Sequence, residues 1–141
     1  MHHKIELVKI IPDQDQIRLL FELLSRRRHS ISHNTMPTYD QHIEFVQNNP
    51  YRAWFIIYEQ DKAIGSVYVQ FDNSIGLNVD DEISTVTLKN IIDQVKMRLS
   101  PLEAIPSLRY KDFFFNVAIS NKKLQQKLEI LGFKPSQMSY V

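Results

Sequence analysis

The chain ends in a segment that reads Asn116-Val-Ala-Ile-Ser-Asn121 and then Lys122-Lys-Leu-Gln-Gln-Lys-Leu-Glu-Ile-Leu-Gly-Phe133. The first part is typical of a strand. The second is typical of an amphipathic helix, because leucines recur at helical spacing at Leu124, Leu128 and Leu131. Asn121 can accept a hydrogen bond from a free N–H group of the first turn, and Gly132 can adopt the left-handed conformation that ends a helix. We therefore predict a strand, an Asn-capped helix and a glycine stop.

Hydrophobic periodicity upstream predicts the other elements. A strand around Ile5 and Leu7 precedes a helix with Ile17, Leu20, Phe21 and Leu24 on one face, and the basic residues 26–28 suit the dipole at its carboxyl end. A capping box at residues 38–41 opens a second helix. Three strands, a third helix, a further strand, the last helix and a final strand follow; their predicted ranges, where we assign one, are 53–58, 63–71, 74–79, 85–99 and 113–120.

Composition favours one compact domain spanning residues 1–141. The chain has 141 residues, 43% of them hydrophobic, which is enough for a single core. A net charge of +1 gives no support for nucleic acid or a membrane surface as partner. The sequence has no cysteine, which excludes disulfides and thiolate chemistry. It shows no signal peptide, so we expect a cytoplasmic protein, and we predict no metal site.

The element order and the Asn and Gly-Phe residues of the ending resemble the GNAT superfamily of acyl-CoA N-acyltransferases over nearly the whole chain. The resemblance implies an α/β (α+β) fold: a mixed, mostly antiparallel twisted sheet with helices on both faces. The strand from Ser74 should then pair in parallel with the strand from Phe113. The family commonly has a proton-donating Tyr on its last helix, and Leu128 stands at that position here.

The middle of the chain is similar to a GNAT subgroup whose members often acylate amino sugars. This similarity rests on residues 29–46, 49–57 and 64–68. It implies an acceptor pocket lined by His29, Tyr51, Trp54, Tyr68 and Phe71. His33 is the candidate catalytic residue, because it lies in a polar loop with no helical or strand pattern. The alternative is that the strand aromatics are core residues and that the loop histidine is solvated.

The resemblance implies acetyl-CoA as cofactor, but one motif is missing. The family binds the pyrophosphate with a glycine-rich loop between the fourth strand and the third helix. Residues 79–88 contain no glycine here and bring in three carboxylates at Asp80, Asp81 and Glu82, which would repel phosphate. Alternatively, these acidic residues simply favour the dipole of a helix capped by Ser84 or Thr85. The implied cofactor-binding residues are Leu77, Asn78, Val79, Ser84, Thr85, Thr87, Asn116 and Asn121.

Two functions follow from these observations. The first is an N-acyltransferase that moves an acetyl group from acetyl-CoA to an amine of a small molecule, with an amino sugar as one candidate; residues 33–71 favour it. The second is a GNAT-fold ligand-binding or interaction module that has lost acetyl-CoA binding, favoured by residues 80–87. A small-molecule amine is the expected partner of the enzyme, with neither nucleic acid nor membrane, and a homodimer is compatible with both functions.

Overall fold

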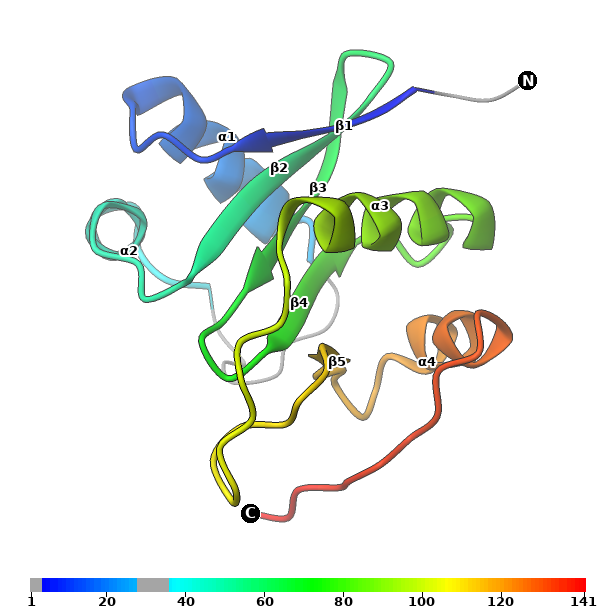
Figure 1. Cartoon of the computed structure of the whole chain (residues 1–141). Coiled ribbons are helices and arrows are strands. Elements are labelled where there is room, and N and C mark those ends of the chain that lie inside the picture. Colours follow the sequence, from blue (N-terminus) through cyan, green and yellow to red (C-terminus); the bar gives the residue numbers. More distant parts are fainter. Residues whose placement is uncertain (1–3, 28–35) are drawn as a thin grey trace.

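The computed structural model describes residues 4–27 and 36–141. Its five-stranded sheet has the order β1-β2-β3-β4-β5. The first four strands pair antiparallel, and β4 pairs in parallel with β5 through Ser74–Phe114 and Ile75–Phe115. This arrangement confirms the predicted mixed, mostly antiparallel sheet (Figure 1). The strands are β1 Ile5–Lys9, β2 Ala53–Glu59, β3 Lys62–Val69, β4 Ser74–Val79 and β5 Phe114–Phe115.

Helices cover both faces of this sheet, as predicted. Helices α1 (Gln14–Ser25) and α2 (Tyr39–Gln47) pack on one face, where they enclose Ile56 of β2. Helix α3 (Thr85–Arg98) packs on the other face and crosses the sheet in front of the strands in Figure 1. Helix α4 (Lys122–Ile130) packs against α3. Because both faces are covered, a ligand site is expected at the strand ends or at a gap between strands.

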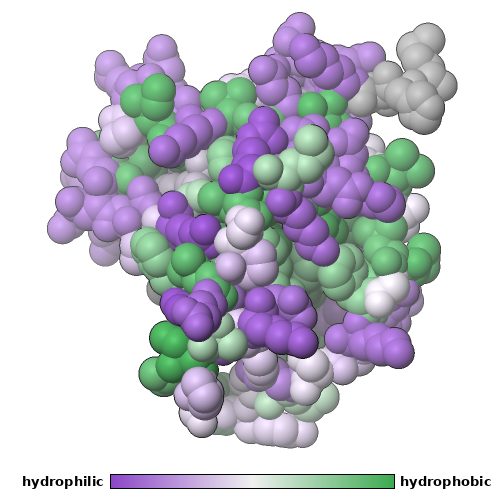
Figure 2. Space-filling view, in the orientation of Figure 1, coloured by the Kyte–Doolittle hydropathy of each residue, from purple (hydrophilic) through white to green (hydrophobic). Residues whose placement is uncertain are grey.

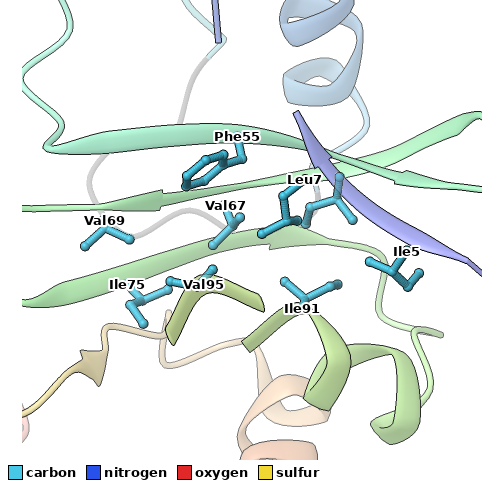
Figure 3. Packing of buried hydrophobic residues seen from close by; sticks show 9 residues of the cluster. Ile5, Leu7, Phe55, Val67, Val69, Ile75, Ile91 and Val95 are labelled. Atoms are coloured by element: carbon cyan, nitrogen blue, oxygen red, sulfur yellow. The ribbon is translucent and has the colours of Figure 1, made fainter. Parts of the chain in front are cut away.

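The core between the sheet and α3 consists of side chains that alternate along the strands. Ile91 and Val95 of α3 pack against a row of apolar strand residues that crosses the sheet (Figure 3). The strand residues of this row are Ile5, Leu7, Phe55, Ile57, Val67, Val69 and Ile75, and all are buried. Such alternation buries one side chain in two on this face, so the intervening residues are available to the α1 and α2 side.

Helix ends follow the sequence pattern closely. Thr38 and Gln41 form the predicted capping box, and Asn121 accepts a hydrogen bond from the N–H of Leu124. Gly132 has a φ of 100°, and the N–H groups of Gly132 and Phe133 donate to the carbonyls of Glu129 and Leu128. This is the Schellman geometry expected of a glycine stop.

Three details of the prediction were wrong. Strand β5 has two residues instead of eight, because the chain turns at Ala118, whose carbonyl accepts hydrogen bonds from the N–H of Asn121 and the side chain of Gln125. No strand follows α4, since residues 134–141 are exposed and lie outside the sheet. In α1 the third fully buried residue is Leu23, whereas Leu24 is half-buried.

The outer edge of the sheet at β1 is covered by side chains of α3. The Gln94 side chain donates to the carbonyl of Ile5 at 2.8 Å, and Arg98 donates to the carbonyl of Leu7. The carbonyl of Lys4 accepts the N–H of Gln60 and therefore faces β2. Because successive carbonyls along a strand point in opposite directions, those of Ile5 and Leu7 point away from β2. The face covered by α3 and α4 interleaves hydrophilic and hydrophobic residues without one broad apolar area (Figure 2).

His42 of α2 is buried between the two helices of the opposite face. Its Nε2 lies 2.8 Å from the carbonyl of Ile17, and its ring contacts the rings of Phe21 and Tyr39. Burial lowers the pKa of His42 below the usual 6.5, and the hydrogen bond to Ile17 opposes this effect only partly. His42, for which the sequence indicates no role, is thus a core residue.

We expect the free energy of unfolding to fall as the pH drops below 6.5, the ordinary pKa of this side chain. The pKa of His42 is lower in the folded than in the unfolded chain, so the unfolded chain binds more protons in this range and stability rises with pH. Urea unfolding of the wild type and of His42→Phe across pH 5–8 measures this contribution. The variant should lose part of the pH dependence, and identical pH profiles would contradict the assignment.

Candidate functional site

A gap opens in the sheet between β4 and β5. The parallel pairing ends at Ile75 and Phe115, whereas β4 continues to Val79. The carbonyl of Ser74 accepts the N–H of Gln70, so the backbone groups of Ser74 face β3. In an antiparallel pair every second residue faces the neighbouring strand, so Leu77 and Val79 direct their N–H and C=O groups away from β3. The backbone of both residues therefore faces the side on which β5 has already turned away.

An open hollow lies at the carboxyl end of β4. It spans about 570 Å³, including open solvent at its mouth, and is formed by the end of α1, the start of β3, the end of β4 and the cap of α4. Its charged and amide residues are Arg26, Arg27, Asn78, Asp80, Asp81 and Asn121. Four of the predicted cofactor residues, Leu77, Asn78, Val79 and Asn121, thus line one hollow.

The other predicted cofactor residues lie elsewhere. Ser84 is the N-cap of α3, and its hydroxyl accepts from the N–H of Thr87 and bonds the Thr87 hydroxyl at 3.0 Å. Thr85 is the first residue of α3 and, like Ser84 and Thr87, does not line the hollow. Asn116 is exposed beyond β5 and is not part of its lining. The hydroxyls of Ser84 and Thr87 are therefore engaged in capping the helix.

The acidic turn before α3 receives two lysines from α4. Lys123 forms an ion pair with Glu82 at 2.6 Å, and this hydrogen-bonded pair lowers the pKa of Glu82. Lys127 donates to the backbone carbonyl of Asp81. The positive charges therefore offset part of the repulsion that the sequence predicts for a phosphate at this turn.

The position of the family's proton donor is apolar in the structure as well. Leu128 is buried against Leu88, Ile92 and Leu124 in the contact between α3 and α4. A side chain with no ionisable group cannot protonate a leaving thiolate. Any such proton must come from another donor, for which water is sufficient at some loss of rate, about 10²–10⁴-fold for one general acid.

Four aromatic side chains gather over β2 and β3 on the α1 and α2 side of the sheet. We call Phe45, Tyr51, Trp54 and Tyr68 the aromatic group. The Tyr51 and Tyr68 rings stack with centroids 4.1 Å apart, and Trp54 meets Tyr51 edge-on at 5.1 Å. Trp54 Nε1 is buried and has no hydrogen-bond partner among the described residues. Three of the predicted acceptor-side residues thus form one cluster.

Of the remaining predicted acceptor residues, Phe71 is described by the structure and does not join this cluster. Phe71 lies at the turn after β3, is 58% exposed, and makes no ring contact with the aromatic group. His29 and His33 lie outside the described residues.

Arg27 links the hollow to the aromatic group. It lines the hollow, and its guanidinium lies close enough to Tyr51 and Tyr68 to counteract the rise in their pKa. Burial is the main cause of that rise for both tyrosines. From the sequence alone, the basic residues here are expected to interact with the helix dipole only. Nothing in the local sequence shows that the end of α1 meets β4.

Residues 4–27 and 36–141 offer neither a metal site nor a membrane span. This part of the chain contains no group of three or more His, Cys, Asp or Glu side chains able to hold a metal ion. It also contains no helix that is both long and apolar enough to cross a membrane.

The arrangement of strands and helices matches solved acetyltransferases. Neither a family model nor a curated protein matches the sequence. The structure is similar to a spermidine N-acetyltransferase from Vibrio cholerae, solved as a dodecamer, with a TM-score of 0.58 and 14% identity over 94% of this chain and 81% of that one. It is also similar to an aminoglycoside N-acetyltransferase in complex with CoA, with a TM-score of 0.64 and 13% identity over 100% and 95%. The chain therefore has the GNAT fold, as the sequence predicted.

Proposed function

We propose that the protein is an acyl-CoA-dependent N-acyltransferase that acetylates an amine of a small molecule. The carrying observation is the gap between β4 and β5, where the backbone of Leu77 and Val79 faces away from β3. An extended amide-containing arm can pair with such a strand edge as an added strand would. The fold of the structural neighbours, one of them in complex with CoA, supports the proposal.

The residues of the gap fit the pantetheine arm of acetyl-CoA better than they fit its pyrophosphate. When bound, acetyl-CoA supplies the reactive acetyl thioester. Leu77 and Val79 would hold the arm through backbone N–H and C=O groups. Near the phosphates, Lys123 and Lys127 would attract the negative charge. They would thereby replace in part the backbone N–H donors of the glycine-rich loop that is missing here. The aromatic group would exclude water from the acceptor and position its amine.

A second candidate function is a ligand-binding module of GNAT fold without acetyl-CoA. The observation that favours it is the turn before α3, which has three carboxylates and no glycine. In addition, the ion pair between Lys123 and Glu82 and the bond from Lys127 to Asp81 tie α4 to this turn. Such contacts would have to loosen for a pyrophosphate to enter.

Isothermal titration with acetyl-CoA separates the two candidates. The enzyme predicts saturable binding, together with release of free thiol when an amine is added. Absence of binding at millimolar acetyl-CoA would leave the ligand-binding module as the function.

We expect variants on the acceptor side to lower turnover or acceptor affinity while the protein stays folded. His33→Ala tests the predicted catalytic residue, and wild-type rates across a panel of amines would remove it from the site. Trp54→Ala creates a cavity that costs about 3–5 kcal/mol of stability, so Trp54→Phe is the better variant. Trp54→Phe keeps an aromatic ring in the cluster, leaves a smaller cavity than alanine would, and removes the unpartnered N–H. Steady-state kinetics on variants with unchanged circular dichroism measure both effects.

A further inference from the structure

The turn between β4 and α3 uses backbone donors for its own hydrogen bonds. The N–H of Glu82 donates to a carboxylate oxygen of Asp80 at 2.8 Å, and the N–H of Ile83 donates to the carbonyl of Asp80 at 3.1 Å. At the start of α3, the N–H of Thr87 donates to the hydroxyl of Ser84 at 3.1 Å. A phosphate cradle at a turn and helix start depends on free N–H groups. Three of the groups that could form one are therefore already bonded here.

The side chains around this turn add a second obstacle to a pyrophosphate. Asp80 and Asp81 line the hollow directly after β4. Both lysines that α4 brings to the turn are engaged. Lys123 pairs with Glu82 at 2.6 Å, and Lys127 donates to the carbonyl of Asp81. A phosphate would compete for these ammonium groups and would also meet the charges of Asp80 and Asp81, so attraction and repulsion offset each other.

The arginines of the hollow lie away from this turn. Arg26 and Arg27 belong to the end of α1 and line the hollow there. Neither lines the smaller pocket that Asp80 and Asp81 share with Lys127 near the start of α3. The two arginines therefore do not replace the bonded N–H groups of the turn.

The edge of β4 offers better conditions to a pantetheine arm. Leu77 and Val79 direct their N–H and C=O groups toward the gap, and no backbone group among the described residues bonds them there. Pantetheine is uncharged and carries amide groups, which can pair with such an edge as an added strand would. The edge can therefore hold the arm regardless of the group attached to its far end.

Resting on the N-acyltransferase function proposed above, we propose that the site recognises its acyl donor through the pantetheine arm alone, and that the nucleotide part of acetyl-CoA adds no net affinity. The donors are then pantetheine thioesters as a class. In a working cradle, each charge-assisted hydrogen bond to a phosphate would be worth about 10-fold or more in affinity. Here Asp80, Ser84 and Glu82 already occupy donors that such bonds would need.

Acetyl-pantetheine and acetyl-CoA form a matched pair of donors, because they share the arm and the thioester and differ only in the phosphorylated nucleotide. We expect their dissociation constants, measured by calorimetry without an amine, to lie within about three-fold of each other, because attraction and repulsion offset each other at the turn. Higher salt should not weaken acetyl-CoA relative to acetyl-pantetheine, because no net attraction is left to screen. With an amine that the protein accepts, the two donors should also have similar kcat/KM values.

Hydrogen exchange followed by NMR locates the contacts on the backbone. Both donors should slow exchange of the N–H groups of Leu77 and Val79, which face the gap. Acetyl-CoA should add no further protection at Glu82 or Ile83, whose N–H groups are already bonded.

Variants of Asp80 separate the nucleotide from the arm. Asp80→Ala should tighten binding of acetyl-CoA by about three-fold, because it removes one carboxylate and the acceptor that holds the N–H of Glu82. Asp80→Asn keeps an acceptor for that N–H, so the gain should be smaller. Neither change should alter binding of the uncharged acetyl-pantetheine. Asp112→Asn is the matched control: it removes the same charge from an exposed position before β5 that does not line the hollow, and should affect neither donor.

Binding of acetyl-CoA about 10-fold or more tighter than binding of acetyl-pantetheine would overturn the proposal, as would new protection at Glu82 and Ile83. The function as an N-acyltransferase would then stand. Absence of binding by either donor would refute the enzyme and this proposal together. Binding of acetyl-pantetheine without any binding of acetyl-CoA would refute acetyl-CoA as the donor while supporting recognition through the arm.

Discussion

Gly65→Ala is expected to destabilise the protein by about 1–3 kcal/mol, as insertion into a well-packed site does. A Cβ at Gly65 would lie far inside van der Waals contact with the backbone carbonyl of Asn78 on the neighbouring strand. A backbone atom in a ladder cannot swing aside, so β3 and β4 would have to separate locally. Urea unfolding measures the loss. Because Asn78 lines the hollow, binding of acetyl-CoA should weaken as well.

Gly76→Ala is the matched comparison, on the next strand. There the added Cβ would meet the ring of Tyr68, a half-buried side chain that can rotate away. We expect a smaller loss of stability but a disrupted Tyr51–Tyr68 stack, with weaker binding of the acceptor. If Gly65→Ala proved as stable as the wild type, the close approach of β3 and β4 at this point would be contradicted.

Replacing Asp80, Asp81 and Glu82 with Gly, Asn and Gln is expected to tighten binding of acetyl-CoA. A like-charge contact at ~6 Å costs about 1 kcal/mol even when well screened, so removing these carboxylates should gain on the order of 10-fold in affinity. The gain should be larger at low than at high salt, because screening weakens exposed charges. Calorimetric titration at two ionic strengths measures it.

The ion pair between Lys123 and Glu82 supplies the control for this prediction. Glu82→Gln alone removes one carboxylate and its ion pair with Lys123, whereas Lys123→Gln removes that cation and should weaken binding. Micromolar binding by the wild type with no effect of the triple change would mean that the carboxylates point away from the phosphates. The hypothesis of a lost cofactor would then fall.

The sequence predicted most of the fold because its signals are local. The change from strand to helical hydrophobic period locates β4 and α3 along the chain. The start of α3 follows from Ser84, which caps the helix. Strand β5 was predicted too long because the carbonyl of Ala118 is bonded by Gln125 from the next helix. Periodicity cannot show such a competing turn.

The candidate site was predictable only in part, for a related reason. The resemblance indicated Leu77, Asn78, Val79 and Asn121, which do line one hollow, although their roles remain a prediction. Arg27 and Lys123 act on partners far away in the sequence. Lys123 is 41 residues from Glu82, and Arg27 acts on the pKa of Tyr68 only because the end of α1 lies near β3 and β4. Contacts of this range depend on how the chain folds back on itself.

The side chains of α3 that cover β1 bear on how copies of the protein can meet. An open strand edge is a template on which another chain can add its own strand, and this is a common route to aggregation. At β1 the carbonyls of Ile5 and Leu7 already accept hydrogen bonds from Gln94 and Arg98, so an incoming strand finds those acceptors occupied. Growth of the sheet by β-augmentation is thereby disfavoured at this end, and an assembly of several copies would have to use other surfaces.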